Sequence, residues 1–341
     1  MSAAGAHTGS APIAVLGSGS WGTALAIAFA RAGKPTRLWG RDPEQLAQMR
    51  ALRCNRRYLP NAPFPERLQI AGSLDAALAG SSEVLIAVPS SGFRRFLEDL
   101  APRLSPGMNV AWATKGFERD SGLLPHQVAH QVLGGNHEVA VLSGPTFAKE
   151  VGAGLPTAMV VASPDAGLAT RIAEDLASPT FRTYISTDIA GVEIGGAVKN
   201  VIAVGAGLSD GLGCGANTRV ALITRGLSEM TRLGIALGAR AETFMGLAGL
   251  GDLVLTCTDD QSRNRRCGLA LARGLTPEAA MQEIGQVVEG FHAARVLRVV
   301  ARRLELELPI CEGICRILFD GADAGEVVRE LMRRPPKAEY E

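Results

Sequence analysis

One lysine in an apolar stretch is the first residue of this sequence whose type and surroundings indicate chemistry. Lys199 lies in GGAVKNVIAVGAG (residues 195–207), among glycine and aliphatic side chains. The chain has 30 arginines and only five lysines, so ordinary exposed basic positions are arginine. Burial of an ammonium favours the neutral amine, which lets a lysine donate or accept a proton near neutral pH. We predict that Lys199 is an acid–base group; the alternative is a buried ion pair with Glu193 or another acid.

A second group of polar residues follows glycine-rich or turn-like sequence in the same half of the chain. Asp252 comes directly after LAGLG, and we expect it at a turn, where it partners a substrate hydroxyl or Lys199. Ser262 is expected to cap a helix whose first turn contains Arg263 and Asn264. A cation in a first helical turn opposes the helix dipole unless an anion binds there. The pattern predicts an anion site at residues 262–264; the alternative is an exposed basic patch.

The sequence GSGSWG (residues 17–22) is the strongest short motif in the first half of the chain. It follows an apolar run that predicts a strand and opens a segment that predicts a helix, which is the setting of dinucleotide-binding turns. In such turns Gly17 permits the tight bend, Gly19 lets the backbone approach a pyrophosphate, and Gly22 lets helix and strand pack closely. The N–H groups of the helix N-terminus then bind the phosphates. An ordinary glycine-rich turn is the alternative.

The end of the next predicted strand, LWGRD (residues 38–42), is where such a site contacts the ribose of its cofactor. An NAD-only site places an acid at the strand tip, whereas this chain has Gly40 followed by Arg41. An arginine there pairs with a 2′-phosphate, while Asp42 before Pro43 is expected to cap a helix. We therefore expect NADP or NAD as cofactor and favour NADPH. If Asp42 instead holds the ribose hydroxyls, NADH is favoured.

Two more segments place polar groups at the carboxyl ends of predicted strands, where ligands gather in a doubly wound sheet. Lys115 closes NVAWATKG (residues 109–116), and SGPTFAKEV (residues 143–151) leaves its strand through Gly144 toward Thr146. We expect Lys115 to meet an anionic or carbonyl ligand, with a plain surface lysine as the alternative. Thr146 and nearby backbone N–H groups are expected at the same rim.

The elements that must position these residues change in character along the chain. Strands are predicted at PIAVLG, PTRLWG, LQIA, EVLIAVP, NVAWAT, EVAVLSGP, TAMVVAS and TFRTYIS, with helical segments between them, which indicates parallel strand–helix–strand units with helices on both faces of the sheet. From residue 188 onward the segments are long and helical in pattern. We predict an α/β Rossmann-type, doubly wound dinucleotide-binding domain over residues 1–187 and an all-α substrate-binding domain over residues 188–341.

Composition limits the classes of protein that fit. The 35 Lys and Arg residues balance 34 Asp and Glu residues, and a net charge of +1 argues against a nucleic-acid-binding surface. The six cysteines show neither metal-binding nor disulfide spacing, so no metal is expected. The first residues lack a secretory signal, and the longest apolar stretch, residues 200–208, is too short to span a bilayer. We expect a cytoplasmic protein with no transmembrane segment and no nucleic-acid partner.

At these motifs the sequence resembles the NAD(P)-dependent glycerol-3-phosphate dehydrogenases of the bacterial, biosynthetic type. The resemblance runs from Ile13 to about Leu331, and its most specific part is GAVKNVIAVGAG (residues 196–207). GSGSWGTALA, SGPTFAKEV, NTRVALITRGLSEM, LAGLGDLVLTC, SRNRR and VVEG follow in the family's order. The resemblance implies reversible NAD(P)H-dependent reduction of dihydroxyacetone phosphate to sn-glycerol 3-phosphate, mainly for glycerophospholipid synthesis. We also expect a homodimer.

The resemblance further implies roles for individual residues, with Lys199 as the proton acceptor. The cofactor residues, including the glycines of the turn, are then Gly17, Gly19, Ser20, Trp21, Gly22, Arg41, Lys115, Ala148, Arg263, Val287 and Glu289. The implied substrate residues are Lys115, Gly144, Thr146, Lys199, Asp252, Ser262, Arg263 and Asn264. From the residues alone Glu289 is a weak candidate, because glutamate before glycine often marks only a turn. Thr146 stands where the family often has serine and keeps the hydroxyl, and the residues before Ile13 lie outside the family's pattern.

Two other functions remain as alternatives. β-Hydroxyacid dehydrogenases also join a Rossmann-type domain to a helical domain that carries a lysine, but they act on carboxylates. A non-catalytic nicotinamide sensor is expected to lack the lysine or the anion site, and this chain has both Lys199 and Arg263. Assays with dihydroxyacetone phosphate and with 3-hydroxy acids separate these functions.

Overall fold

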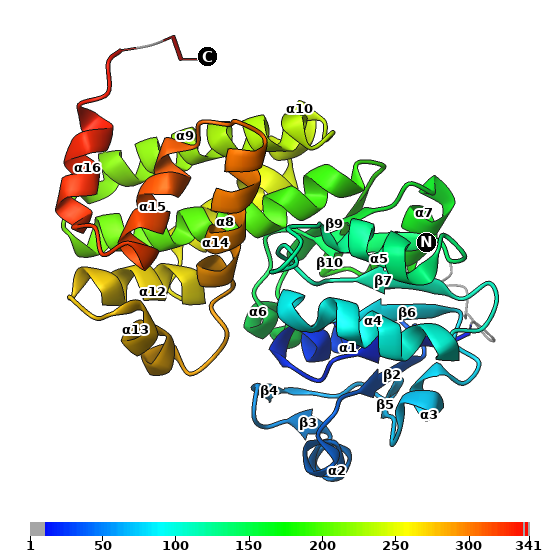
Figure 1. Cartoon of the computed structure of the whole chain (residues 1–341). Coiled ribbons are helices and arrows are strands. Elements are labelled where there is room, and N and C mark those ends of the chain that lie inside the picture. The colour runs from blue at the N-terminus through cyan, green and yellow to red at the C-terminus, as the bar shows by residue number, and fades with distance from the viewer. Residues whose placement is uncertain (1–10, 337, 340–341) are drawn as a thin grey trace. The chain divides into compact units, whose positions relative to one another are not determined.

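The computed structural model describes residues 11–336, 338 and 339, which form two compact units (Figure 1). The first contains the described residues up to Glu118 together with Leu123–Glu193. The second contains Arg119–Gly122 and the described residues from Ile194 onward. The functional domain boundary expected after residue 187 stays a prediction. The expectation of no secretory signal concerns residues 1–10 in the main, and these lie outside the described residues.

A four-residue excursion of the chain belongs to the second unit although its neighbours in sequence belong to the first. Within it, Arg119 Nη2 lies 3.0 Å from His292 Nδ1. A Cβ placed on Gly122 would lie 3.0 Å from a methyl carbon of Val300, so the excursion packs directly on the helix that carries both partners. That helix is α14 (Glu289–Arg303).

The first unit is built on one eight-stranded sheet with the order β10-β9-β8-β7-β6-β1-β2-β5. Each predicted strand is present, because each is a short apolar run bounded by glycine, proline or polar residues. The six strands from β8 to β5 in this order are parallel to one another. The strands are β1 (Ile13–Leu16), β2 (Thr36–Trp39), β5 (Leu68–Ile70), β6 (Glu83–Ile86), β7 (Asn109–Trp112), β8 (Val139–Ser143), β9 (Thr157–Ala162) and β10 (Phe181–Ser186).

Two strands depart from the expected parallel units. β9 is antiparallel to β8 and β10 is parallel to β9, so both point opposite to the other six. A parallel connection must carry the chain back along the sheet, usually through a full helix. After β8 the chain forms only the six-residue helix α6 (Ala148–Ala153), which is about 9 Å long. This helix is too short for the return, so β9 starts near the edge where β8 ends.

Helices cover both faces of this sheet, as predicted (Figure 1). Leu25 of α1 and Ile172 of α7 belong to the core on one face, and on the other Phe93 of α4 meets Trp112 edge-to-face at 5.5 Å between ring centroids. A small hairpin of β3 (Cys54–Asn55) and β4 (Leu59–Pro63) was not predicted. The remaining helices are α1 (Ser20–Arg31), α2 (Pro43–Leu52), α3 (Leu74–Leu78), η1 (Ser90–Gly92), α4 (Phe93–Leu100), η2 (Ala101–Arg103), α5 (Pro125–Leu133) and α7 (Ala166–Leu176).

The described part of the second unit is helical, as predicted. Its long helix α8 (Ile189–Gly211) begins in the last residues of the first unit and carries Lys199. The other helices are α9 (Gly215–Ala236), α10 (Ala241–Phe244), η3 (Leu247–Gly251), α11 (Asp252–Thr258), α12 (Arg263–Ala272), α13 (Pro277–Ile284), α14, α15 (Pro309–Phe319) and α16 (Ala324–Met332).

Helix α8 corrects one expectation about the apolar stretch around residues 200–208. At 23 residues, with a mean hydropathy of 1.4 in its most apolar window, the helix is long and apolar enough to cross a membrane by length and composition alone. The argument from length was therefore wrong. Of that window, 94% is buried inside the protein.

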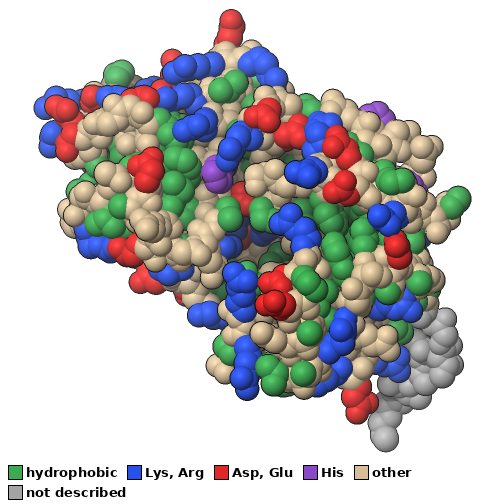
Figure 2. Space-filling view, turned by 60° about the horizontal axis from the view of Figure 1, so that its bottom comes forward, with side chains coloured by type: hydrophobic (Ala, Val, Ile, Leu, Met, Phe, Trp, Pro, Cys, Tyr) green, Lys and Arg blue, Asp and Glu red, His purple; other side chains and the backbone are tan. Residues whose placement is uncertain are grey.

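Charged side chains of both signs are interspersed over the face of the molecule that Figure 2 shows. Lys and Arg lie among Asp and Glu there, in keeping with the formal net charge of +1.

Candidate active site

The glycine-rich turn between β1 and α1 is constrained by the protein at two glycines and open at the third. Gly17 has φ +128°, and a Cβ there would lie 2.4 Å from the Ala87 carbonyl oxygen. A Cβ on Gly22 would lie 1.9 Å from the Gly17 carbonyl oxygen, so the start of the helix touches the turn. A Cβ on Gly19 would meet no described atom within 4 Å. The space beside Gly19 therefore suits the pyrophosphate expected there.

The first turn of α1, which begins at Ser20, has the properties of an anion site. Gly19 is the N-cap and offers no side-chain acceptor, and no acid lies in the first turn. Its N–H groups and the positive end of the helix dipole are therefore available to a phosphate. The Trp21 Nε1 atom is buried without a hydrogen-bond partner among the described residues. Trp21 and Ala148, two expected cofactor residues, both pack against the core of the first unit.

A polar layer beneath this turn escaped the sequence analysis. Asn55, in the small hairpin, is buried, and its Nδ2 donates to the Ser18 carbonyl at 3.0 Å and to Thr23 Oγ1 at 2.8 Å. Gln45 Nε2 donates to the same Ser18 carbonyl at 3.1 Å. These bonds hold the backbone of the turn from two neighbouring elements. Only tertiary packing brings residue 55 to residue 18, so no local pattern marks it.

The tip of β2 is shaped by the same turn. A Cβ on Gly40 would lie 1.9 Å from Ser18 Oγ, so an acidic side chain at this position would collide with the turn. Asp42 caps α2, as predicted, with Oδ1 accepting from Glu44 N at 3.1 Å and Gln45 N at 3.0 Å. The Arg41 side chain is exposed and has no polar partner among the described residues. The tip of β2 thus presents the Arg41 guanidinium, while the Asp42 carboxylate is already bonded to backbone N–H groups of α2.

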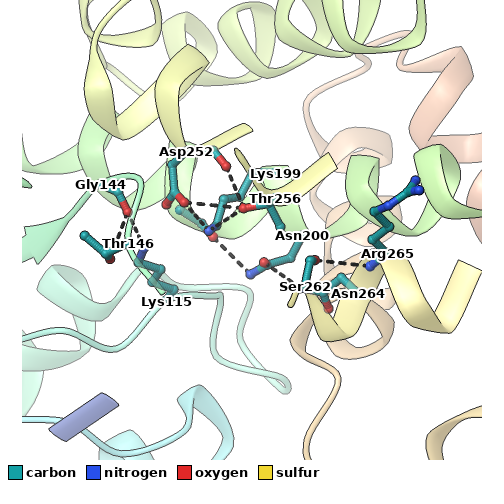
Figure 3. A network of polar contacts seen from close by, with 11 residues as sticks. Lys115, Gly144, Thr146, Lys199, Asn200, Asp252, Thr256, Ser262, Asn264 and Arg265 are labelled. Carbon is teal, nitrogen blue, oxygen red and sulfur yellow. Dashed lines mark hydrogen bonds and ion pairs between the residues drawn. The ribbon is translucent and has the colours of Figure 1, made fainter. Parts of the chain in front are cut away.

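Lys115, Gly144 and Thr146 lie together after the carboxyl ends of β7 and β8, as the sequence predicted (Figure 3). Lys115 Nζ donates to the Gly144 carbonyl at 3.3 Å, and Thr146 Oγ1 donates to the same oxygen at 3.2 Å. Gly144 has φ +153°, and a Cβ there would lie 3.1 Å from Met159 Cα. A glycine is therefore needed where β8 turns toward α6, and its carbonyl gathers the two side chains.

Lys199 is buried on α8, and its ammonium contacts the Asp252 carboxylate (Figure 3). Nζ also donates to Thr256 Oγ1 at 3.0 Å, and the Thr256 hydroxyl lies 2.5 Å from the Asp252 carbonyl oxygen. The Lys199–Asp252 pairing was one of two predicted alternatives for the aspartate. Asp252 is the first residue of α11 rather than a turn residue, because η3 leads straight into that helix. Thr256, one helical turn later, was not predicted.

Glu193 is not the partner of Lys199: the buried ion pair that was the alternative for this lysine is present, with Asp252 as the acid. Its Oε1 accepts from Trp112 Nε1 at 2.8 Å and from His126 N at 3.0 Å, and its Oε2 lies 2.6 Å from His126 Nδ1. Burial raises the pKa of the Glu193 carboxyl, and the hydrogen bonds from His126 and Trp112 oppose that rise. The start of α8 is therefore tied to β7 and α5.

The turn before α12 forms the cap predicted for it. Ser262 Oγ accepts from Arg265 N at 3.2 Å. The Asn264 side chain is buried and engaged at both ends: Nδ2 donates to Asn200 Oδ1 at 2.8 Å, and Oδ1 accepts from Gly290 N at 2.9 Å (Figure 3). Asn264 thus joins α12 to α8 and α14. One amide N–H of its side chain and the backbone N–H groups of Arg263 and Asn264 remain for a ligand, since that of Arg265 is bonded to Ser262.

Arg263 is the first residue of α12 and is partly buried. Burial lowers the pKa of its guanidinium, the Glu289 carboxylate opposes this shift, and the nearby Arg266 adds to it. Arg263 Nη1 donates to Gln286 Oε1 at 3.2 Å. Val287 is exposed, and Glu289 opens α14. A desolvated cation at a helix N-terminus is stabilised when an anion joins it.

Among the residues that the structure describes, no group of three or more His, Cys, Asp or Glu side chains is placed to hold a metal ion. The site within the second unit therefore consists of a buried lysine with two oxygen partners and a helix start that attracts anions. The first unit supplies a glycine turn, a free helix N-terminus and the Lys115 cluster. Each is a set of groups for binding phosphate or moving a proton.

Comparisons with known proteins cover both units. The sequence pattern described as NAD-dependent glycerol-3-phosphate dehydrogenase N-terminus matches residues 12–169, and the pattern described as its C-terminus matches residues 188–329. A relative named glycerol-3-phosphate dehydrogenase (NAD(P)+) from Thioalkalivibrio sulfidiphilus is 56% identical over 329 residues, which are 96% of this chain and 99% of the relative. A relative of the same name from Aeromonas salmonicida is 54% identical over 328 residues, 96% and 98% of the two chains.

A solved structure agrees with these sequence matches. Glycerol-3-phosphate dehydrogenase from Coxiella burnetii superposes with a TM-score of 0.91 at 46% identity, covering 95% of this chain and 99% of that one. A glycerol-3-phosphate dehydrogenase from yeast shares the fold, with a TM-score of 0.82 at 23% identity. The predicted order, a Rossmann-type sheet domain followed by helices, is confirmed. By sequence pattern, identity and fold, this chain belongs to the NAD-dependent glycerol-3-phosphate dehydrogenase family.

Proposed function

We propose that this chain reduces dihydroxyacetone phosphate to sn-glycerol 3-phosphate with NAD(P)H, reversibly, and thereby supplies glycerophospholipid synthesis. The observation that carries the proposal is the buried network of Lys199, Asp252 and Thr256, which lies in the same helical unit as the N-terminus of α12. A proton-transfer group and a phosphate site are the two features that this substrate requires. The names of close relatives support the same reaction.

Lys199 is the proposed acid–base group. When bound, NAD(P)H supplies the hydride that adds to C2 of the substrate. Lys199 donates a proton to the C2 oxygen during reduction and accepts it during oxidation, and as a cation it stabilises the negative charge that develops there. Asp252 and Thr256, one turn apart on α11, both bond the ammonium and so fix its position.

The turn of residues 262–264 is the proposed phosphate site. Arg263 contributes charge, and the first-turn N–H groups of α12 contribute directed donors. Ser262 and Asn264 keep the turn in shape through the bonds they already make. The hydroxyl proton of Ser262 and the remaining amide proton of Asn264 are further donors. Lys115, Gly144 and Thr146 are proposed substrate contacts of the first unit.

The cofactor site is proposed at the start of α1. The open side of Gly19, the unoccupied first turn and the unpartnered Trp21 Nε1 are compatible with a dinucleotide phosphate. Ser20 and Gly22 lie in the same turn. We also assign Lys115, Ala148, Arg263, Val287 and Glu289 to the cofactor, on the strength of the resemblance.

NADPH is the proposed preferred cofactor, with NADH accepted. Gly40 excludes an acid from the strand tip because Ser18 occupies the space, and Asp42 is used as a helix cap. Arg41 is then the charged group left to meet a ribose substituent, and a guanidinium pairs well with a phosphate. The proposal also includes a homodimer in the cytoplasm, which sedimentation at two protein concentrations and cell fractionation test.

The experiment is to follow reduced nicotinamide consumption with dihydroxyacetone phosphate, using NADPH and NADH in turn. Turnover with dihydroxyacetone phosphate but not with 3-hydroxyisobutyrate or 6-phosphogluconate in the reverse direction supports the proposal. Turnover confined to those carboxylates would assign the chain to β-hydroxyacid chemistry. Tight cofactor binding without any turnover would support a sensor.

A further inference from the structure

Helices α8 and α12 lie against one another along a seam of small residues. A Cβ on Gly268 would lie 2.0 Å from the Val204 carbonyl oxygen, and a Cβ on Gly211 would lie 2.4 Å from the Ala272 Cβ. Gly207, between these points, would meet the backbone of α12 at 1.9 Å. From Asn200 with Asn264, through Val204 with Gly268, to Gly211 with Ala272, the two helices run in broadly the same direction, and at Gly207 the backbone of α8 also meets that of Arg265.

Small residues along the contact let the two helices approach closely, but they do not by themselves fix the axial register of one helix on the other. Large side chains interlock as ridges and grooves, whereas glycine and alanine offer shallow ones. Polar contacts must then set the register. One is the bond from Asn264 to Asn200 at 2.8 Å. Lys199 and Arg263 are the sequence neighbours of these two residues, so the register sets the separation of the proposed proton donor and phosphate site.

The second contact is an ion-pair cluster centred on Arg265, in which Asp210 is largely buried and Asp260 is 71% exposed. Its Nη1 contacts the Asp210 carboxylate near the end of α8, and Nε donates to Asp260 Oδ1 at 2.9 Å. Nη1 also lies 3.4 Å from the Cys257 carbonyl oxygen. The Arg265 and Asp210 side chains are only 10% and 12% exposed. Arg219 Nη1 of α9 donates at 2.8 Å to Asp210 Oδ2, the same oxygen that Arg265 contacts, so the carboxylate is held by a second element as well.

Given the reaction proposed above, we infer that Arg265 is a positioning residue that fixes the register of α12 on α8 through Asp210. Arg265 itself need not touch the substrate: its guanidinium is committed to Asp210 and Asp260. Buried ion pairs add little net stability, and their best-attested role is to specify one register among several. The cluster sets the distance between the Lys199 ammonium and the turn of residues 262–264.

The short substrate makes this distance critical. Dihydroxyacetone phosphate must present its C2 oxygen to one site and its phosphate to the other, and its three-carbon frame cannot stretch. A misplacement of about 1 Å between such groups can cost on the order of 10²-fold in rate. A compound that uses only one of the two sites is insensitive to the same shift.

The test uses the full chain with Arg265→Gln, and Arg266→Gln as the matched control on the exposed next position of α12. Three quantities are measured: kcat/KM for dihydroxyacetone phosphate, kcat/KM for unphosphorylated dihydroxyacetone, and the inhibition constant of inorganic phosphate. In Arg265→Gln we expect the first to fall by about 10- to 100-fold, with the other two changed less than about threefold. Arg266→Gln should leave all three near the parent values.

Each contrary pattern has a distinct meaning. A rise in the phosphate inhibition constant would make Arg265 a direct phosphate ligand, and a parallel loss for both substrates would make it a general structural residue; either overturns the inference. An Arg265→Gln variant whose three measured values match those of Arg266→Gln also overturns the inference. Failure of the parent enzyme to reduce dihydroxyacetone phosphate would instead refute the proposed function.

A second variant covers the case in which Arg265→Gln does not fold. Asp210→Asn keeps the size of the anchor, removes its charge, and leaves Arg265 its bond to Asp260. We expect the same selective loss for the phosphorylated substrate. Arg265→Lys should retain part of the activity on dihydroxyacetone phosphate that Arg265→Gln loses. One ammonium can pair with Asp210 but cannot also reach Asp260 in the fork geometry. Equal losses for phosphorylated and unphosphorylated substrate in Asp210→Asn would overturn the inference.

Discussion

The ammonium of Lys199 is held by Asp252 and Thr256, and its removal leaves a buried carboxylate without its cation, so activity and stability are both measured. Lys199→Ala should lower kcat by roughly 10²-fold or more, because the transition state loses its proton donor and a stabilising charge. Cofactor binding, followed by the fluorescence of NADPH, should stay near the parent value. Lys149→Ala, at an exposed lysine of α6, is the control. Near-normal turnover of Lys199→Ala would show that Lys199 is not the acid–base group.

Arg263 is tested by comparing substrates that differ only in the phosphate. Arg263→Ala should raise KM for dihydroxyacetone phosphate strongly and leave activity on dihydroxyacetone almost unchanged. The loss of a charge-assisted contact should cost about 1.5–3 kcal/mol in kcat/KM. Arg266→Ala serves as the control for general charge near α12. Equal loss with both substrates would mean that Arg263 supports the fold and does not bind phosphate.

Arg41 is tested by cofactor choice. Arg41→Ala should raise KM for NADPH several-fold more than KM for NADH, because only NADPH carries the 2′-phosphate that the guanidinium meets. High salt should weaken the NADPH preference of the parent enzyme in the same direction. Arg67→Ala, at an exposed arginine just before β5, is the control. If both KM values rise together, Arg41 does not contact the 2′-phosphate.

Single residues were predictable from the sequence where their role depends on near neighbours. The caps formed by Asp42 and Ser262 follow from spacings of two or three residues, and the glycine turn follows from its place between strand and helix. Asn55 and Thr256 were missed because their partners lie far away in sequence or one turn along a helix that was not predicted to begin at Asp252.

At the scale of elements, the seam between α8 and α12 predicts a large penalty for one added methyl group. Gly207→Ala gains at most about 1 kcal/mol in helix propensity. The new Cβ would lie 1.9 Å from the Arg265 carbonyl oxygen, a backbone atom that cannot rotate away. Overpacking of this kind costs about 1–3 kcal/mol, so the free energy of unfolding should fall on balance.

Denaturant unfolding of Gly207→Ala, measured against the parent, checks this penalty. Gly92→Ala is the control, because a Cβ at Gly92 would meet no described atom within 4 Å. Its midpoint should shift little. An unchanged midpoint for Gly207→Ala would show that the two helices can separate at this point without cost.

The elements themselves were largely predictable, and their directions were not. Each strand carries its own apolar run, and each unit its own periodicity, so the Rossmann-type sheet and the helical second half follow from local patterns. The reversal of β9 and β10 depends on where the chain re-enters the sheet after α6. The direction of a strand is therefore set by the length of the connection before it and by packing, and the residues of the strand itself do not predict it.

At the scale of the whole molecule, the cysteines divide into two reactivity classes. Burial raises the pKa of Cys257 and of Cys315 to about 12 and that of Cys267 to about 11, and raises that of Cys311 well above its ordinary value. Because the thiolate is the reactive form, these four should resist alkylation at pH 8 in the folded protein. Cys54 and Cys214 are only partly buried and should react first.

Mass spectrometry after a short iodoacetamide pulse, with and without denaturant, measures this division. In the folded enzyme the label should appear on peptides that contain residue 54 or 214, and in denaturant on all six cysteine peptides. Rapid labelling of Cys315 without denaturant would show that α15 opens readily. The rate at which the four buried cysteines are labelled then measures global unfolding of each variant above.

The excursion of residues 119–122 has a consequence for how a gene for this protein can be divided. Cutting the coding sequence between codons 187 and 188 separates two lengths that each match one family pattern. The upstream product would still carry Arg119 and Gly122, which pack on α14 in the downstream product. Split-gene complementation would therefore complete the second unit only when both halves are made together, and a separately expressed helical half would lack the four largely exposed residues that lie against α14.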